Sequence, residues 1–271
     1  PEYGWMNDPN GMFTIIEPNE NHINSPNIEK EMKSIALNIN NYHYLRESSS
    51  LFKDFDVLHH FHFQYNPYAC VWGNMHWAHA ISKDFIRWEY LPLSLCPDEL
   101  GQIFSGSAFI DKDNKSGFGK DSVLAYYTSA GAHQQQSMAY STDKGFTFTK
   151  YERNPIIPNE EKPDFRDPKV VIIKNGGVRS TIMCLAVGDH IEFYGKTDNM
   201  IDWTYLSSFG STYGAHGGVW ECPDLLYFKE YNKYVLLVNI NPGSPNGGSS
   251  CQYFVGDFDG VTFTCDDSPE T

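Results

Sequence analysis

S-K-D-F-I-R-W at residues 82–88 is the first of four segments in which an acidic turn precedes an aromatic side chain. The other three are S-T-D-K-G-F-T-F (141–148), T-D-N-M-I-D-W (197–203) and D-F-D-G-V-T-F (257–263). Their closing aromatic residues, Trp88, Phe148, Trp203 and Phe263, are 60, 55 and 60 residues apart. This period, with about four short strands per unit, is typical of β-propeller blades. The alternative is a set of unrelated hairpins that share turn chemistry.

The stretches between these markers contain short apolar runs and turn residues. Residues 123–128, 181–187 and 234–240 are strand-sized and rich in β-branched and aromatic side chains. Long helical periodicity is almost absent. The sequence therefore predicts an all-β fold, a β-propeller, over residues 1–271.

Residues 19–56 interrupt the pattern. Seven asparagines lie between Asn19 and Asn41, and Ile28, Met32 and Ile35 have the spacing of one amphipathic helix. We predict that this segment is an insertion within the first blade, either a surface loop or a partner-binding element.

Composition narrows the classes of partner. A net charge of -14 repels phosphate backbones, which argues against nucleic-acid binding. No apolar run approaches the roughly 20 residues of a membrane span. The six cysteines form no C-x-x-C pair, so zinc or thioredoxin chemistry is not predicted, and they can be free or paired at a distance. The sequon at Asn114 is compatible with secretion, and we expect an extracellular protein.

Three acidic residues lie in similar local sequences. They are Asp8 in W-M-N-D-P-N-G (5–11), Asp167 in F-R-D-P (165–168) and Glu221 in W-E-C-P (220–223). Asp167 and Glu221 precede their markers by 36 and 42 residues, and Asp8 precedes Trp88 by 80, or about 40 without the insertion. All three then fall on the first strand of a blade, which lines the axis of a propeller. We predict that they meet at one mouth of the channel, with Ser105 of F-S-G-S (104–107) in the corresponding place of the second blade.

Converging carboxylates can hold different protonation states at one pH, as glycoside hydrolysis requires. One acid then assists the leaving group while another, ionised, attacks. Arg166 is expected to keep Asp167 ionised. A metal site built from the same acids is the competing interpretation, but neither a histidine partner nor an Asp-x-Asp loop supports it. Cys222 has no histidine base in register, so we assign it to packing.

With these motifs the chain resembles glycoside hydrolase family 32, the invertases, exo-inulinases and levanases. W-M-N-D-P-N-G, F-R-D-P and E-C-P occur in the family's order. Further matching segments are F-Q-Y-N-P (63–67), V-W-G (71–73), W-A-H-A (77–80), F-S-G-S (104–107), N-I-N-P-G-S-P-N-G-G-S (239–249) and Q-Y-F-V-G-D-F-D-G (252–260). The resemblance covers residues 3–17 and 58–264.

The resemblance implies a five-bladed propeller followed by a β-sandwich, and a retaining mechanism without cofactor or metal. It assigns Asp8 as the nucleophile, Glu221 as the general acid and base, and Asp167 as the residue that holds the fructosyl hydroxyls. It implies that the fructose subsite is lined by Asn7, Gln64, Trp72, Phe104, Ser105 and Arg166. For Trp72 and Gln64, core packing and backbone hydrogen bonding are the alternatives that the residues alone leave open.

Four repeat markers account for the chain. We therefore expect about four of the five blades and no sandwich, as in a truncated enzyme. The predicted reaction is hydrolysis of terminal β-D-fructofuranosyl groups from sucrose or a fructan. The alternatives are a fructosyltransferase with the same triad and an inactive sugar-binding fragment. The sequence does not predict the oligomeric state.

Overall fold

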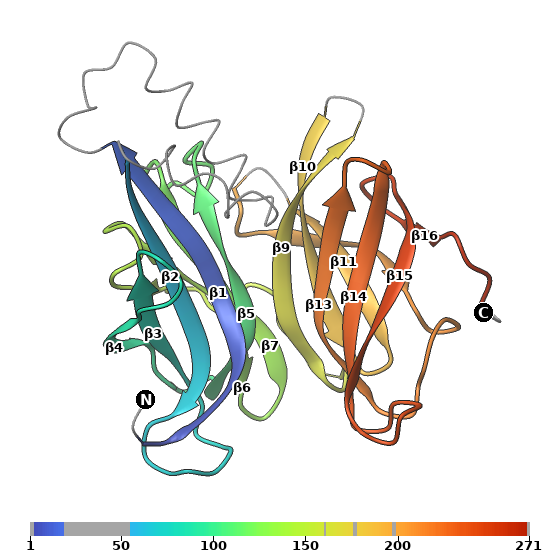
Figure 1. The fold of residues 1–271 in the computed structure, drawn as a ribbon, viewed down its shortest axis with the longest axis horizontal. Helices are drawn as coiled ribbons and strands as arrows, with labels where there is room; N and C mark the ends of the chain where they lie inside the picture. The colour runs from blue at the N-terminus through green and yellow to red at the C-terminus, as the bar shows by residue number, and fades with distance from the viewer. Residues whose placement is uncertain (1–2, 19–54, 160, 176–177, 197–198, 270–271) are drawn as a thin grey trace.

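The computed structural model describes residues 3–18, 55–159, 161–175, 178–196 and 199–269. These stretches contain sixteen β-strands and no helix. The strands form four antiparallel four-stranded sheets that follow one another along the chain, each with its strands in chain order or its reverse. The prediction of an all-β propeller with four blades is confirmed (Figure 1).

Each sheet is a meander of four consecutive strands. The first sheet comprises β1 (Trp5–Pro18), β2 (Phe55–Asn66), β3 (His76–Ser82) and β4 (Glu89–Leu95). The second comprises β5 (Gln102–Asp111), β6 (Ser122–Ala130), β7 (Gln134–Ser141) and β8 (Thr149–Lys150). The third comprises β9 (Phe165–Asn175), β10 (Val178–Val187), β11 (His190–Lys196) and β12 (Trp203–Phe209). The fourth comprises β13 (Val219–Phe228), β14 (Lys233–Asn241), β15 (Ser250–Phe258) and β16 (Phe263–Cys265).

The four sequence markers mark the entry to the last strand of each sheet. Trp88 and Phe148 directly precede β4 and β8, while Trp203 and Phe263 are the first residues of β12 and β16. An Asp or Asn side chain before each aromatic accepts backbone amides of the turn, and in the third marker this side chain is Asn199. Asp84 Oδ1, for example, accepts the amides of Ile86 (2.9 Å) and Arg87 (2.8 Å). The repeat is therefore one structural unit, because the same turn recurs at the same place in each blade.

The expected insertion falls between β1 and β2 of the first sheet. β1 and β2 pair up to Pro18 and Phe55, so the residues on either side of positions 19–54 are partners in the ladder. Residues 19–54, which include the expected helix, lie outside the described residues. The last two residues of the expected 19–56 insertion belong to β2. Asp8 lies near the opposite end of the β1–β2 ladder.

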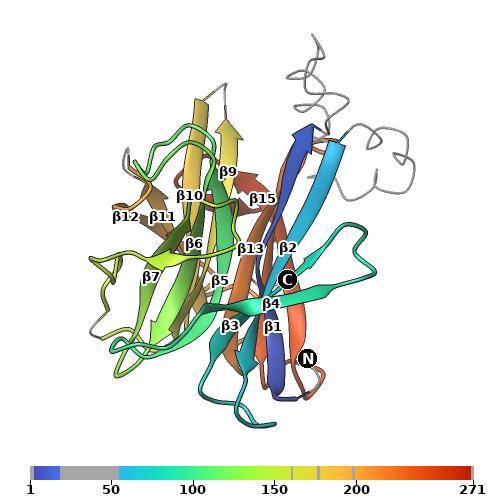
Figure 2. The same ribbon diagram turned by 90° about the vertical axis from the view of Figure 1, so that its left-hand side faces the viewer.

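The first strands of successive sheets, β1, β5, β9 and β13, are neighbours (Figures 1 and 2). Apolar side chains fill the space between sheets, as expected where antiparallel sheets pack face to face. Phe165 and Met183 of the third sheet pack with Leu124 and Tyr126 of the second. This stacking brings the beginnings of the four first strands together.

A group of histidines occupies the packing layer of the first sheet. His60, His62 and His79 are fully buried, and Phe13 stacks on His60 with ring centroids 4.5 Å apart. His60 Nδ1 lies 2.9 Å from His79 Nε2, and the His62 and His79 rings stack at 4.3 Å. Within the described residues, His60 Nε2, His62 Nε2 and His79 Nδ1 have no hydrogen-bond partner. Burial lowers the pKa of His60 to about 3 and that of His79 to about 4.

We expect the fold to lose stability as the pH falls below about 6.5. The unfolded chain takes up protons on these histidines near their ordinary pKa, whereas the folded chain does not until about pH 3 to 4. Each then lowers the free energy of unfolding by up to about 1.4 kcal/mol per pH unit in that window. Urea unfolding of His60→Phe between pH 7 and pH 4.5 should show a smaller pH dependence than the parent. An unchanged slope would contradict the assignment, and His133→Gln, in an exposed loop, is the control.

Candidate active site

The three predicted carboxylates lie at equivalent positions of three blades. Asp8 is the fourth residue of β1, while Asp167 and Glu221 are the third residues of β9 and β13. Ser105 is the fourth residue of β5. Each belongs to the first strand of its sheet, close to where that strand begins, as the repeat spacing predicted.

A β-bulge lies at each of these positions. The ladders shift register between Met6 and Pro9, between Ile103 and Gly106, between Arg166 and Lys169, and between Glu221 and Asp224. A bulge inserts an unpaired residue and re-aims a side chain, and bulges are common beside active sites. The prolines of the D-P and C-P dipeptides, Pro168 and Pro223, fall within two of these bulges, where no ladder donor is needed. Asp167 (φ 64°) and Cys222 (φ 49°) adopt the left-handed conformation there.

Hydrogen bonds link these bulges across the blades. Ser105 Oγ donates to Asp8 Oδ2 (2.6 Å), and Cys222 Sγ lies 3.9 Å from the same oxygen. The Cys222 amide donates to Asp167 Oδ2 (2.9 Å). The second and fourth blades thus both contact the Asp8 carboxylate, and the fourth also contacts Asp167.

Arg166 is the cation at the centre of the acidic group. Its side chain is buried, and Nη2 donates to Glu221 Oε1 (2.9 Å) while Nε lies 3.8 Å from Asp167 Oδ2. Nη1 pairs with Asp164 Oδ1 (2.5 Å) and also donates to Gln134 Oε1 (3.2 Å). Burial disfavours the guanidinium charge, but Asp167, Asp164 and Glu221 raise the pKa of Arg166 above its ordinary value. One cation therefore faces three carboxylates.

Asp167 differs in one respect from the expectation based on sequence. Burial raises the pKa of Asp167 from 3.8 to about 6, although Arg166 and the Cys222 amide lower it. The charges of Asp8 and Glu221 add to the increase. The expectation that Arg166 keeps Asp167 ionised neglected this desolvation. Asp167 titrates near pH 6 rather than near pH 4.

The remaining predicted residues border the same region. Asn7 Nδ2 donates to Gln64 Oε1, so Gln64 pairs with a side chain rather than with the backbone. Trp72 is 55% exposed and meets Phe104 edge to face, with centroids 5.7 Å apart. Core packing of Trp72 is therefore excluded, and an aromatic surface is open to a ligand.

Several supporting residues carried no recognisable signal in the sequence. Asp164 and Gln134 bind Arg166, and Asn10 Oδ1 accepts the Gly106 amide (3.1 Å) beside the Ser105 bulge. Their partners are far away in the chain, apart from the Asp164–Arg166 pair. Asn10 is part of the motif that contains Asp8, and that proximity is the one clue that could have identified it.

The cysteines are not arranged for covalent chemistry. All six are free. Burial raises the pKa of the Cys222 thiol well above its ordinary value, and the neighbouring carboxylates raise it further. Because the thiolate is the nucleophilic form, Cys222 is unsuited to attack.

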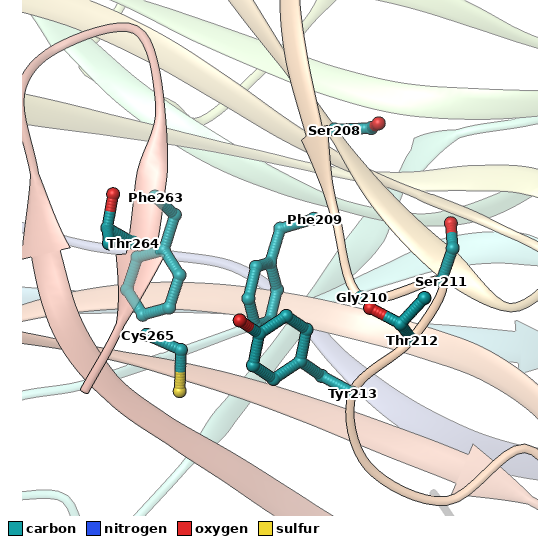
Figure 3. Close-up of a pocket in the computed structure, with 9 residues that line it drawn as sticks. All are labelled: Ser208, Phe209, Gly210, Ser211, Thr212, Tyr213, Phe263, Thr264 and Cys265. Atoms are coloured by element: carbon teal, nitrogen blue, oxygen red, sulfur yellow. The ribbon is translucent and has the colours of Figure 1, made fainter. Parts of the chain in front are cut away.

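A separate pocket of about 320 Å³ lies on the outer part of the third and fourth sheets (Figure 3). It is lined by residues 208–213 and by Phe263, Thr264 and Cys265, and it includes none of the predicted site residues.

No group of three or more His, Cys, Asp or Glu side chains in the described ranges could hold a metal ion. In the described part of the chain, no helix has the length and apolarity of a membrane span.

Comparisons with known proteins give a consistent result. Residues 43–271 match the family model described as the glycosyl hydrolases family 32 N-terminal domain. The chain is 45% identical to a levanase of Bacillus subtilis, over 99% of this chain and 35% of the levanase. It is 36% identical to an extracellular exo-inulinase of Aspergillus awamori, over 98% of this chain and 48% of the inulinase.

Solved structures resemble the fold as well. The fructofuranosidase of Schwanniomyces occidentalis complexed with fructose superposes with a TM-score of 0.76 at 35% identity. That match covers 99% of this chain and 47% of the fructofuranosidase. The chain thus spans about a third to a half of the length of these relatives.

Proposed function

This chain belongs to glycoside hydrolase family 32, and on that premise we propose that it cleaves terminal β-D-fructofuranosyl groups from sucrose or related fructosides, with retention of configuration. The observation that carries the proposal is that three carboxylates, one each from β1, β9 and β13, meet in one site: Arg166 contacts Asp167 and Glu221, and the Asp8 charge acts on Asp167. Two carboxyl groups with different protonation are what retaining hydrolysis requires.

The proposed mechanism uses two displacements at the anomeric carbon of the fructosyl group. In the first, Asp8 attacks this carbon, and Glu221 donates its proton to the departing glycosidic oxygen. In the second, Glu221 takes a proton from water, the water oxygen bonds to the anomeric carbon, and the Asp8 carboxylate leaves. Glu221 is then protonated again, which completes the cycle.

The other residues are assigned to binding and charge stabilisation. Asp167 accepts fructosyl hydroxyls, and Arg166 fixes the two acids beside it. Ser105 donates to the same Asp8 oxygen that Cys222 approaches, so it holds that carboxylate in one orientation. Asn7, Gln64, Trp72 and Phe104 line the fructose subsite, with the exposed Trp72 ring as an apolar wall.

The substrate class follows from the relatives. Levanase and exo-inulinase are the names of the relatives above, so a fructan end is the proposed substrate, and sucrose is proposed with it because it carries the same terminal fructosyl group. Extracellular localisation is proposed because relatives of this chain are described as extracellular. A fructosyltransferase would use the same fructosyl-enzyme and differ in the acceptor.

The direct test is release of glucose and fructose from sucrose by the 271-residue chain. Release of both sugars in equal amounts supports a hydrolase. Glucose in excess over free fructose, with longer oligosaccharides formed, favours a transferase. The proposed activity would be refuted if the folded chain released neither glucose from sucrose nor fructose from inulin and levan.

The pH profile should depend on Asp167. Because its pKa is about 6, we expect kcat/KM to fall as the pH drops through about 6. Arg166→Gln removes a group that lowers this pKa, so the acidic limb should move to higher pH, and activity should fall by roughly 10²-fold or more through lost positioning. Lys169→Gln, which removes the ion pair between Lys169 of β9 and Asp224 of β13, is the control and should leave the limb in place. An unshifted limb in Arg166→Gln would contradict the assignment.

A further inference from the structure

The bulge at Asp167 depends on side chains of the preceding blade. The Asp167 amide donates to Thr128 Oγ1 (3.0 Å), and Thr128 is on β6 of the second sheet. Thr128 Oγ1 in turn donates to Gln136 Oε1 (2.8 Å), and Gln136 Nε2 donates to the Phe165 carbonyl (2.8 Å). Two side chains thus hold the backbone on both sides of Arg166.

This arrangement is closed to water. Thr128 and Gln136 have no exposed surface, and Asp167 is 6% exposed. A buried amide without a partner is costly, so the amide that the bulge removes from the ladder needs an acceptor in the protein. Thr128 is that acceptor, and Gln136 fixes the direction of its hydroxyl proton.

The same relation recurs around the axis. The Gly106 amide in the Ser105 bulge donates to Asn10 of the first blade, and the Cys222 amide in the Glu221 bulge donates to Asp167 of the third blade. In each case a side chain of one blade accepts a backbone amide from the bulge of the next. Thr128 therefore holds Asp167, and the Asp167 carboxylate holds the bulge next to Glu221.

We propose that Thr128, oriented by Gln136, is a positioning residue that fixes the orientation of the Asp167 carboxylate and, through it, that of Glu221. The inference rests on the proposed function, because it concerns the accuracy of that site. Side chains that must be placed within a fraction of an ångström lose much of their effect when their support is removed.

The test compares three variants of the full chain. Thr128→Val keeps the shape but removes the hydroxyl, so kcat/KM for sucrose should fall by about 10- to 100-fold. Thr128→Ser restores the hydroxyl and should stay within about 3-fold of the parent. Ser129→Ala is the matched control, because Ser129 is equally buried on β6 but bonds Ser137 and not the bulge. Ser129→Ala should retain activity while losing about as much thermal stability as Thr128→Val.

Two readouts separate positioning from a purely structural effect. The acidic limb of kcat/KM should move to higher pH in Thr128→Val, because Asp167 loses its fixed relation to Arg166 and the Cys222 amide. Fructose affinity, measured by calorimetry on samples with equal folded fractions, should weaken in Thr128→Val and not in Ser129→Ala. Neither readout responds to a smaller folded fraction.

The outcomes are distinguishable. If the folded parent neither turns over fructosides nor binds fructose, the proposed function fails, and this inference fails with it. If the parent does both while Thr128→Val behaves like Ser129→Ala, only the inference is overturned. It is overturned as well if Thr128→Ser is as impaired as Thr128→Val.

Discussion

Asp8→Asn is expected to lower kcat for glucose release from sucrose by at least about 10³-fold, with the fold retained. The amide has nearly the shape of the carboxylate and can still accept the proton of Ser105 Oγ, which lies 2.6 Å from Asp8 Oδ2. It cannot form the acyl linkage to fructose, however, because the amide oxygen is a poor nucleophile. The loss therefore concerns the chemical step, and fructose affinity should change much less than kcat.

The measurement is single-turnover and steady-state glucose release, with tryptophan fluorescence to confirm folding. Asp113→Asn, a change of an exposed turn carboxylate, is the matched control and should leave kcat unchanged. Mass spectrometry of the enzyme, denatured during turnover, should detect no fructosyl adduct in Asp8→Asn. If this variant retained more than a tenth of the parent's kcat, the nucleophile would have to be a different group.

The blade repeat was predictable because it depends on interactions within short segments of the chain. In each turn an Asp or Asn oxygen accepts backbone amides two to four residues ahead, and the aromatic that follows lies at the entry to the last strand. Local interactions of this kind recur wherever the same short sequence occurs. Counting back from the markers then placed Asp8, Asp167 and Glu221 on first strands, where the structure has them.

The geometry of the site was less accessible, because it depends on contacts between distant segments. Asp-Pro dipeptides are common in turns, but at Asp167 and Glu221 the structure contains bulges that continue the strand and redirect the side chain. Arg166 was expected to act on its neighbour Asp167, whereas its closer carboxylate partners are Asp164 and Glu221. Glu221 is 55 residues away in the chain, and nothing in the local sequence specifies that pair.

Burial explains why the pKa of Asp167 differs from the expectation based on sequence. A sequence shows that Arg166 adjoins Asp167 but not that the carboxylate is 6% exposed. Desolvation depends on the packing of the whole site and here outweighs the neighbouring cation. Thr128 escaped notice for the same reason, since its role depends on a bulge amide that the sequence does not reveal.

Glu221→Gln should distinguish the two displacements from each other. Because glutamine cannot supply the proton of the Glu221 carboxyl, the departure of glucose from sucrose should slow by roughly 10² to 10⁴-fold. An aryl fructoside with a good leaving group needs little protonation, so its first displacement should be much less affected. The second displacement still lacks a base, and the fructosyl-enzyme on Asp8 should accumulate as a burst of released aryl alcohol.

Burst kinetics with the aryl fructoside, followed by mass spectrometry of the quenched enzyme, would detect that species. Glu230→Gln, in the exposed turn after β13, is the matched control and should show the parent's behaviour with both substrates. Equal losses on sucrose and on the aryl fructoside, without a burst, would assign Glu221 to binding instead of proton transfer. Since Asp8→Asn should give no adduct with either substrate, accumulation in Glu221→Gln together with its absence in Asp8→Asn would assign attack to β1 and proton transfer to β13.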